Sequence, residues 1–350
     1  MKIGLLTYHH SVNNGAMMQT YATCRALKEL GHDVVIVDIR QPEKRNHGIS
    51  SMITSLWCIK RDNEINKFKK QFYPPLTRRY YSVDELRKNP PEVDCLIVGS
   101  DQTWNPDIAK EMTMAYFLDF GSDKLKRISY ASSFGISEWP TDSTITSDVQ
   151  NALDRFNSIS VRESTGVDLL KKTFGKQGTL VVDPTMLFES FPELTREIKQ
   201  RQEILCYKLY RNSDFYNNIG EVKRQLKMPA RLLNNLTPVK GLRYTYPPSV
   251  SEWIERIGGA GFVITDSFHG TVFSLLYKRQ FAVIRNHNSR ESRYRDLLNQ
   301  LGVGNRLFDS VEQLSKMAST LEPIDYSLVT PKISMLRQSS WDYLKQALSE

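Results

Sequence analysis

The segment VITDSFHGTVFSLL, residues 263–276, combines an acid/base side chain with the start of a predicted helix. The preceding apolar run ends at Thr265, and Asp266 or Ser267 can cap the helix. Apolar residues at 268, 272, 275 and 276 share one helical face, which predicts that His269 lies off that face in the first turn. The positive helix end favours a bound anion, and a bound phosphate favours the protonated imidazole. His269 is therefore a candidate general acid, although a histidine here could simply hydrogen-bond a neighbouring loop.

Arginines supply the second kind of candidate chemistry. The step SVRE, residues 160–163, places Arg162 at the end of a predicted strand, where its planar fork could hold a carboxylate or phosphate with two bonds. The alternative is that Arg162 pairs with Glu163 or another acid at the sheet edge. Near another strand end stand Arg285, Arg290, Arg293 and Arg295, at least two of which fit a solvated helix face.

Three polar turns follow predicted strands and are candidates for ligand contact. They are residues 8–17 (YHHSVNNGAM), 99–106 (GSDQTWNP) and 130–135 (YASSFG). Their Asn, Gly and Ser residues permit tight turns with polar groups left over. Trp104 offers a flat surface for a sugar ring or, alternatively, plugs a domain edge, and His9 and His10 either reach the ligand or lie on the surface. The candidate contact residues are Asn13, Asn14, Gly15, Ser100, Asp101, Trp104, Asn105 and Ser132.

Short apolar runs alternate with amphipathic segments throughout the chain. The first half predicts strands at 2–7, 33–39, 93–99, 127–132, 158–161 and 179–183, with helices at 16–30, 144–156 and 164–174. The second half predicts strands at 204–209, 231–236, 262–265 and 281–284, with helices near 213–226, 250–258, 268–277 and 291–301. Strand–helix–strand units of this kind form parallel sheets covered by helices.

A charged stretch containing Pro192 separates the two halves. We therefore predict a first domain at 1–187, a second at 203–331 and a C-terminal helix at 332–350 that packs back. The expected fold class is α/β, with two Rossmann-like domains. Because ligands of such sheets bind beyond the carboxyl ends of the strands, we expect the two domains to face each other across a cleft.

Composition narrows the class of protein. The chain has 350 residues, 47 of them Lys or Arg and 39 Asp or Glu, which gives a formal charge of +8. This modest, dispersed excess suits anionic substrates or an anionic membrane face, and it does not form the dense patch typical of nucleic-acid binding. No apolar run approaches the ~20 residues of a membrane span, and MKIGLLTYHH lacks signal-peptide features, so we expect a cytoplasmic protein. The four scattered cysteines predict neither a disulfide framework nor a metal site.

In chain order, GSDQTWNP, ISYASSFG, SVRE, VVDPT, TDSFHGTVFSLLY and SRYRDLL resemble the motifs of the polysaccharide pyruvyl transferase family. The opening GLLTYHHSVNNGAMMQTYA is similar to that family's first strand, turn and helix. The resemblance implies a glycosyltransferase-B-like fold. It also implies transfer of a pyruvyl group from phosphoenolpyruvate to paired hydroxyls of a sugar in a cell-surface or capsular polysaccharide, or in its lipid-linked precursor. The products are a cyclic ketal and phosphate, and neither a cofactor nor a metal is implied.

The resemblance also assigns roles to residues. His269 corresponds to the candidate acid/base, and Arg162 corresponds to an arginine that helps to hold phosphoenolpyruvate. Several relatives carry an arginine two residues before that histidine, where this chain has Ser267, and we hypothesise that Arg293 supplies the missing charge. The expected donor-binding set is Arg162, Ser267, Gly270, Thr271 and Arg293, with the acceptor at the turns of the first domain. The alternatives are a nucleotide-sugar glycosyltransferase of the same fold and a non-catalytic carbohydrate-binding relative.

Overall fold

The computed structural model describes residues 1–40, 52–140, 143–233, 241–244, 247–285 and 292–349. The chain divides into two compact units. Unit 1 consists of Met1–His47, Gln71–Phe188 and Ser334–Glu350, and unit 2 consists of Gly48–Lys70 and Glu189–Ile333. Both units are built around a parallel sheet, so the predicted α/β class is confirmed.

The main sheet of unit 1 has the strand order β2-β1-β3-β4, and every pairing is parallel. Its strands are β1 (Lys2–Leu6), β2 (Asp33–Ile36), β3 (Cys95–Val98) and β4 (Lys126–Ser129). A short parallel pair, β5 (Ser160–Val161) and β6 (Thr179–Leu180), is linked to the end of β4 by isolated bridges. The carboxyl ends of these strands therefore bring the polar turns to one edge of the sheet.

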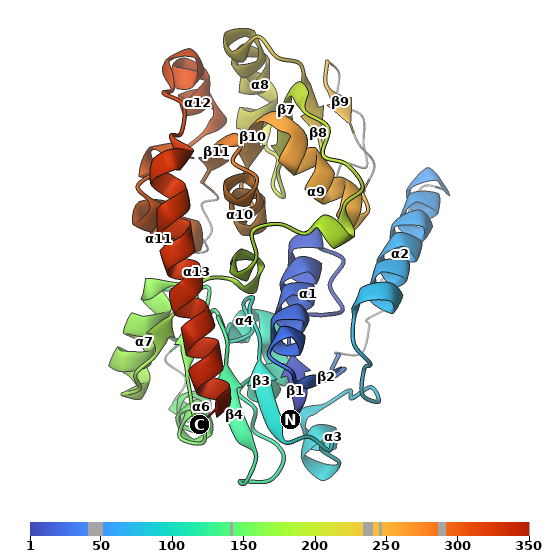
Figure 1. Cartoon of the computed structure of the whole chain (residues 1–350), viewed down its shortest axis with the longest axis vertical. Helices are drawn as coiled ribbons and strands as arrows, with labels where there is room; N and C mark the ends of the chain where they lie inside the picture. Colours follow the sequence, from blue (N-terminus) through green and yellow to red (C-terminus); the bar gives the residue numbers. More distant parts are fainter. Residues whose placement is uncertain (41–51, 141–142, 234–240, 245–246, 286–291, 350) are drawn as a thin grey trace. The chain divides into compact units, whose positions relative to one another are not determined.

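Helices of unit 1 begin where the sequence supplies caps. Asn13 accepts hydrogen bonds from the N–H groups of Gly15 and Ala16 and so starts α1 (Asn14–Glu29), which Figure 1 shows in front of β1. Gly175 ends α7 (Ser164–Phe174) in the left-handed conformation that glycine adopts most easily. The other helices are α3 (Val83–Lys88), α4 (Pro106–Ala109), α5 (Thr113–Tyr116) and α6 (Ser143–Leu153), with 3₁₀ turns η1 (Lys110–Met112) and η2 (Pro184–Leu187).

The sheet of unit 2 has the order β12-β11-β10-β7-β8-β9, again with parallel pairings only. Its strands are β7 (Arg201–Tyr207), β8 (Ala230–Leu232), β9 (Arg243–Tyr244), β10 (Ala260–Thr265), β11 (Gln280–Ile284) and β12 (Leu307–Phe308). The two outermost strands, which are only two residues long, were not predicted. Residues 234–236 of the strand predicted at 231–236 lie outside the described residues.

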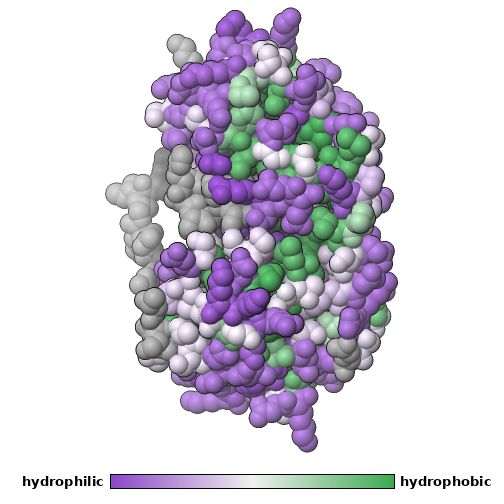
Figure 2. Space-filling model, turned by 90° about the vertical axis from the view of Figure 1, so that its left-hand side faces the viewer, coloured by the Kyte–Doolittle hydropathy of each residue, from purple (hydrophilic) through white to green (hydrophobic). Residues whose placement is uncertain are grey.

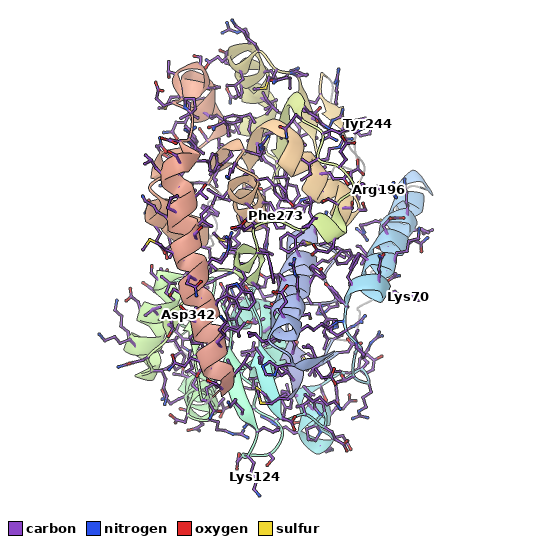
Figure 3. The ribbon with its side chains drawn as sticks, in the orientation of Figure 1. Lys70, Lys124, Arg196, Tyr244, Phe273 and Asp342 are labelled. Atoms are coloured by element: carbon purple, nitrogen blue, oxygen red, sulfur yellow. The ribbon has the colours of Figure 1, made fainter. Side chains whose placement is uncertain are left out.

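In unit 2 the predicted helices near 213–226, 250–258, 268–277 and 291–301 are confirmed, whereas the helix at Val311–Met317 was not predicted. These helices are α8 (Ser213–Leu226), α9 (Val250–Gly259), α10 (Phe268–Leu276), α11 (Ser292–Leu301) and α12 (Val311–Met317), with 3₁₀ turns η3 (Pro192–Leu194), η4 (Gly304–Arg306) and η5 (Ala318–Thr320). Phe273 of α10, labelled in Figure 3, packs edge-on against Trp253 of α9, with 4.6 Å between ring centroids. This contact fixes the helix whose first turn carries His269.

Two helices contain residues of both units. Most of α2 (Met52–Phe72), a helix that was not predicted, belongs to unit 2, whereas its residues fall within the predicted first domain, 1–187. The final helix, α13 (Tyr326–Ser349), begins in unit 2 and ends in unit 1. Within unit 1, its Ser340 hydroxyl accepts a hydrogen bond from Val182 N, and its Tyr343 hydroxyl donates one to Ser129 O.

On the face shown in Figure 2, hydrophilic residues (purple) cover most of the surface, with hydrophobic residues (green) between them. This mixture is common, because folded proteins expose much apolar surface. Among the helices in the described part of the chain, none combines the length and apolar character that crossing a bilayer requires.

Candidate functional site

Arg162 lies at the carboxyl edge of unit 1 with its side chain 0 % exposed. Its Nη1 donates to Asp183 Oδ2 at 3.0 Å and to Ser100 Oγ at 3.2 Å, and its Nη2 donates to Asp101 Oδ1 at 3.3 Å. Glu163 Oε2 lies 3.8 Å from Nε. Burial by itself lowers the pKa of the guanidinium, but the three carboxylates outweigh it and raise the pKa. Arg162 therefore balances a buried acidic cluster.

The carboxylates of this cluster are themselves anchored. Asp183, just after β6, accepts hydrogen bonds from Ser100 Oγ at 2.8 Å and from Thr185 Oγ1 at 2.6 Å. Glu163 accepts hydrogen bonds from Ser133 Oγ at 2.7 Å and Gly135 N at 3.3 Å. Four segments that are far apart in the sequence, GSDQ, YASSFG, SVRE and VVDPT, thus meet in one network. The sequence analysis named Glu163 as a possible partner of Arg162 and missed the part played by Asp183, although an acid directly after a strand was a usable signal for it.

For Arg162, the structure shows the alternative in which the arginine pairs with acids at the sheet edge. Both terminal nitrogens of its fork donate to protein carboxylates, and the side chain has no exposed surface. These bonds hold the loops that follow the strands in place. A direct contact between Arg162 and phosphoenolpyruvate stays a prediction.

Asp101 differs from the other acids of the network. It adopts a positive φ of 83°, which is uncommon for a residue with a side chain and is found where the surrounding structure imposes it. Its Oδ1 accepts hydrogen bonds from Gln102 N and Arg162 Nη2, while 18 % of its side chain stays exposed. Asp101 is thus the acid of this network that reaches solvent, as a residue in contact with a ligand would.

The interpretation of Trp104 as a platform for a sugar ring is wrong. The residue is 0 % exposed, and its ring stacks on Phe117 at 5.2 Å between centroids, with 8° between the planes. Its Nε1 donates to Tyr116 O. Burial of a tryptophan is favourable when its ring packs in the core and its N–H has a hydrogen-bond acceptor, and both conditions are met here.

Other residues that were proposed to contact the acceptor make hydrogen bonds or helix caps within unit 1. Ser132 is buried, and its hydroxyl donates to the carbonyls of Val98 and Gly99. Asn105 caps α4 by accepting a hydrogen bond from Asp107 N. Asn13 caps α1, with Asn14 and Gly15 buried in its first turn. The structure brings these residues to the carboxyl edge of the sheet, where their contact with an acceptor stays a prediction.

His9 and Asp38 form a second buried polar pair in unit 1. His9 Nε2 lies 3.0 Å from Asp38 Oδ1, and the same carboxylate accepts hydrogen bonds from Arg40 Nε at 2.6 Å and Arg79 Nε at 3.2 Å. Burial raises the pKa of Asp38, but the bonds from His9 and Arg40 outweigh it and hold the pKa well below its usual value of 3.8. His9 therefore belongs to the interior, in contrast to both readings of the sequence.

The depressed pKa of Asp38 predicts how stability depends on pH. A carboxylate whose folded pKa lies below its unfolded pKa stabilises the protein above the unfolded value, and this contribution is lost as the pH falls further. We expect Asp38→Asn to lower the Tm by a constant amount between pH 7 and 5, and by less below about pH 4. Thermal unfolding of both proteins at several pH values measures this. A Tm difference that grows as the pH falls contradicts the assignment.

In unit 2, His269 lies in the first turn of α10, directly after β10. Ser267 caps the helix by accepting a hydrogen bond from Gly270 N at 3.3 Å, so the helix begins as the sequence predicts. His269 is only 6 % exposed, and its ring stands at 82° to that of Phe268. The prediction that His269 lies off the packed face is wrong in this respect, because α10 is buried on every side from Phe268 to Leu275.

Gly270 and Thr271, which are expected to bind the donor, both make close contacts within the protein, and their contact with the donor stays a prediction. A Cβ at Gly270 would come within 2.4 Å of Thr265 Oγ1 and 3.0 Å of Tyr207 Cδ1, so protein atoms and not a ligand fill the space beside this glycine. Thr271 Oγ1 donates to Ser267 O inside the helix. Gly270 is thus explained by close packing between α10 and the strand ends.

The structure describes different contacts for two of the basic residues that follow β11. Arg285 pairs with Asp309 at 2.8 Å. The guanidinium of Arg293 lies over the Phe268 ring, 5.9 Å from its centroid, which places a positive charge next to the first turn of α10. Arg290 lies outside the described residues. The contact of Arg293 with Phe268 therefore places its charge near the turn that carries His269.

A buried ion pair beside the same helix was not predicted. Lys208, just after β7, donates from Nζ to Asp266 Oδ2 at 3.1 Å, and both side chains are buried. The sequence analysis considered Asp266 as a possible helix cap, but its carboxylate binds the neighbouring loop. Within the stretches that the structure describes, no three His, Cys, Asp or Glu side chains gather as a metal site.

Comparison with known proteins identifies both family and fold. The sequence model of the family described as polysaccharide pyruvyl transferase matches residues 13–288. General stress protein 30 of Bacillus subtilis (strain 168) is 25% identical over 181 residues, covering 49% of this chain and 52% of that protein, so the match spans about half the length of this curated relative.

Among solved structures, the S. aureus MnaA–UDP co-structure is similar with a TM-score of 0.58 and 12% identity, covering 99% of this chain and 97% of that one. The UDP-N-acetylglucosamine 2-epimerase from Rickettsia bellii is similar with a TM-score of 0.57 and 10% identity, covering 99% and 98%. At such identities the likeness shows the fold alone, which is glycosyltransferase-B-like. Since the family match covers most of the sequence and includes the TDSFHG and SVRE segments, the chain belongs to the polysaccharide pyruvyl transferase family.

Proposed function

We propose that the protein transfers a pyruvyl group from phosphoenolpyruvate to two hydroxyls of one sugar in a polysaccharide or its lipid-linked precursor. The observation that carries the proposal is His269, which stands in a family-matched segment at the start of a capped helix, at the carboxyl end of β10. Parallel α/β sheets bind ligands at this edge. No cofactor enters the scheme.

The chemistry needs one acid and a place for an anion. His269 protonates the methylene carbon of phosphoenolpyruvate, which makes its C2 electron-poor, and a sugar hydroxyl adds there and loses its proton. The C2–phosphate bond then breaks, the second hydroxyl closes the ketal, and hydrogen phosphate leaves. One hydroxyl proton replaces the proton that His269 gave, and the other leaves on phosphate. N–H groups in the first turn of α10 favour the departing anion.

Arg293 is the proposed source of the positive charge that Ser267 does not supply. Its guanidinium already lies near Phe268, the residue between Ser267 and His269. We expect Arg293→Ala to weaken phosphoenolpyruvate binding about tenfold, since a charge-assisted hydrogen bond contributes ~1.5–3 kcal/mol. Calorimetry gives the donor Kd. Arg285→Ala, which removes an arginine paired with Asp309, is the matched control, and a donor Kd that Arg293→Ala leaves unaltered rejects the compensation.

A nucleotide-sugar glycosyltransferase on the same fold is the rival function, and a carbohydrate-binding protein without activity is another. Thermal shifts of the wild-type protein with phosphoenolpyruvate, UDP-glucose and GDP-mannose distinguish the proposed pyruvyl transferase from the glycosyltransferase. The proposal expects a rise in Tm with phosphoenolpyruvate and none with the nucleotide sugars. The reverse pattern supports the glycosyltransferase, and a response to glycans with no donor consumed supports the binding protein.

A further inference from the structure

The loop that follows β7 is fixed by a single carboxylate. Asp266 Oδ1 accepts a hydrogen bond from Leu209 N at 2.7 Å, and Oδ2 accepts from Tyr210 N at 3.0 Å and from Lys208 Nζ at 3.1 Å. Hydrogen bonds to an ionised acceptor are among the stronger ones in proteins. Three consecutive residues are thus held against the segment that leads into α10.

The same loop exposes two large apolar side chains. Leu209 is 40 % exposed and Tyr210 is 49 % exposed, whereas Tyr207 at the end of β7 is fully packed. β7 and β10 are neighbouring parallel strands, with Tyr207 opposite Thr265, so the loop and the first turn of α10 lie at one edge of the sheet. Sites for small molecules are lined mainly by apolar and aromatic side chains, with a few polar groups that orient the ligand.

We propose that Leu209 and Tyr210 form the platform on which the acceptor sugar ring packs beside His269. This inference rests on the proposed function, because pyruvyl transfer requires a sugar hydroxyl near the acid. A tyrosine ring offers a flat, stiff surface, which suits the face of C–H groups on a sugar ring. Stacking on a sugar ring, which the sequence suggested for Trp104, is thus proposed for Tyr210, whose side chain is exposed.

The chain provides a matched control. Tyr216 on α8 is 45 % exposed, belongs to the same unit and follows the same loop, but its ring packs on Phe215. Tyr210→Phe keeps the ring and removes only the hydroxyl. Both substituted tyrosines are at the surface, so the variants are expected to fold, and circular dichroism and Tm check this.

The test measures binding of p-nitrophenyl galactoside, mannoside and N-acetylglucosaminide to each protein by calorimetry, and then the acceptor and donor KM values for any glycoside that is pyruvylated. Loss of a ring contact is expected to raise the glycoside Kd and acceptor KM of Tyr210→Ala about tenfold. The donor KM should stay unchanged, and Tyr210→Phe and Tyr216→Ala should resemble wild type.

Equal glycoside Kd values for Tyr210→Ala and Tyr216→Ala overturn the platform, as does a wild-type protein that binds none of the three glycosides. Calorimetry with UDP provides a further check. If Tyr210→Ala weakens UDP binding and leaves glycoside binding unchanged, the platform is also overturned, because the residue then contacts a nucleotide base. Glycoside binding that Tyr210→Ala weakens, in a wild-type protein that transfers no pyruvate, supports the platform and contradicts the proposed function alone.

Discussion

His269→Ala is expected to abolish phosphate release from phosphoenolpyruvate in the presence of acceptor, while the protein stays folded. The proposed reaction begins with protonation of a carbon, and a positioned general acid accelerates such a step by roughly 10²–10⁴-fold. The helix start that carries the imidazole depends on Ser267 and Gly270, so alanine at 269 leaves its cap intact. Phosphate release measures the effect, and circular dichroism and Tm confirm the fold.

Two variants of the same helix sharpen this prediction. His269→Gln keeps a polar side chain of similar length that is not protonated near neutral pH, and it should be as inactive as alanine. Ser274→Ala removes a buried hydroxyl that donates to Gly270 O, and it should retain activity. Turnover by His269→Ala close to that of wild type would remove His269 from the reaction.

Arg162→Ala is expected to cause a large loss of stability in unit 1. It leaves Asp183, Glu163 and Asp101 without the guanidinium that balances them, and the first two side chains are 0 % exposed. Breaking a buried ion pair from one side costs about 3–5 kcal/mol in the free energy of unfolding. Urea unfolding measures it directly.

Arg155 provides the matched comparison. It pairs with Asp119 at 3.1 Å, and both side chains are 28 % exposed, so Arg155→Ala should cost no more than about 1 kcal/mol. Equal losses for the two alanine variants contradict the account of the acidic network. Arg162→Lys keeps the charge but loses the fork, which makes it the folded variant in which to measure donor binding. An unchanged donor Kd there refutes the contact with phosphoenolpyruvate that the family resemblance implies.

The fold was largely predictable because its signals are local. The apolar stripes of residues 164–174 and 213–226 predicted α7 and α8 to the residue, and Asn13 and Ser267 cap helices as residues of their types do. The short strands β9 and β12 carry too few residues for an apolar pattern, so they could not be found.

The site was less predictable because its contacts are not local. Arg162 meets Asp101 and Asp183 only after folding brings three strand ends together, and spacing alone could not choose between a ligand and those acids. The exposure of Trp104 and His269 depends on what covers them. A helical wheel shows which face of α10 meets the sheet, but it does not show that other elements enclose the opposite face.

Incubation of the wild-type protein with phosphoenolpyruvate and galactosyl, mannosyl and N-acetylhexosaminyl acceptors, followed by mass spectrometry, tests the central claim most directly. The account predicts an acceptor heavier by one pyruvic acid less one water, in step with one phosphate released, and neither product with His269→Ala. Acceptors that keep their mass in the presence of phosphoenolpyruvate, but gain a hexose from a nucleotide sugar, would contradict it.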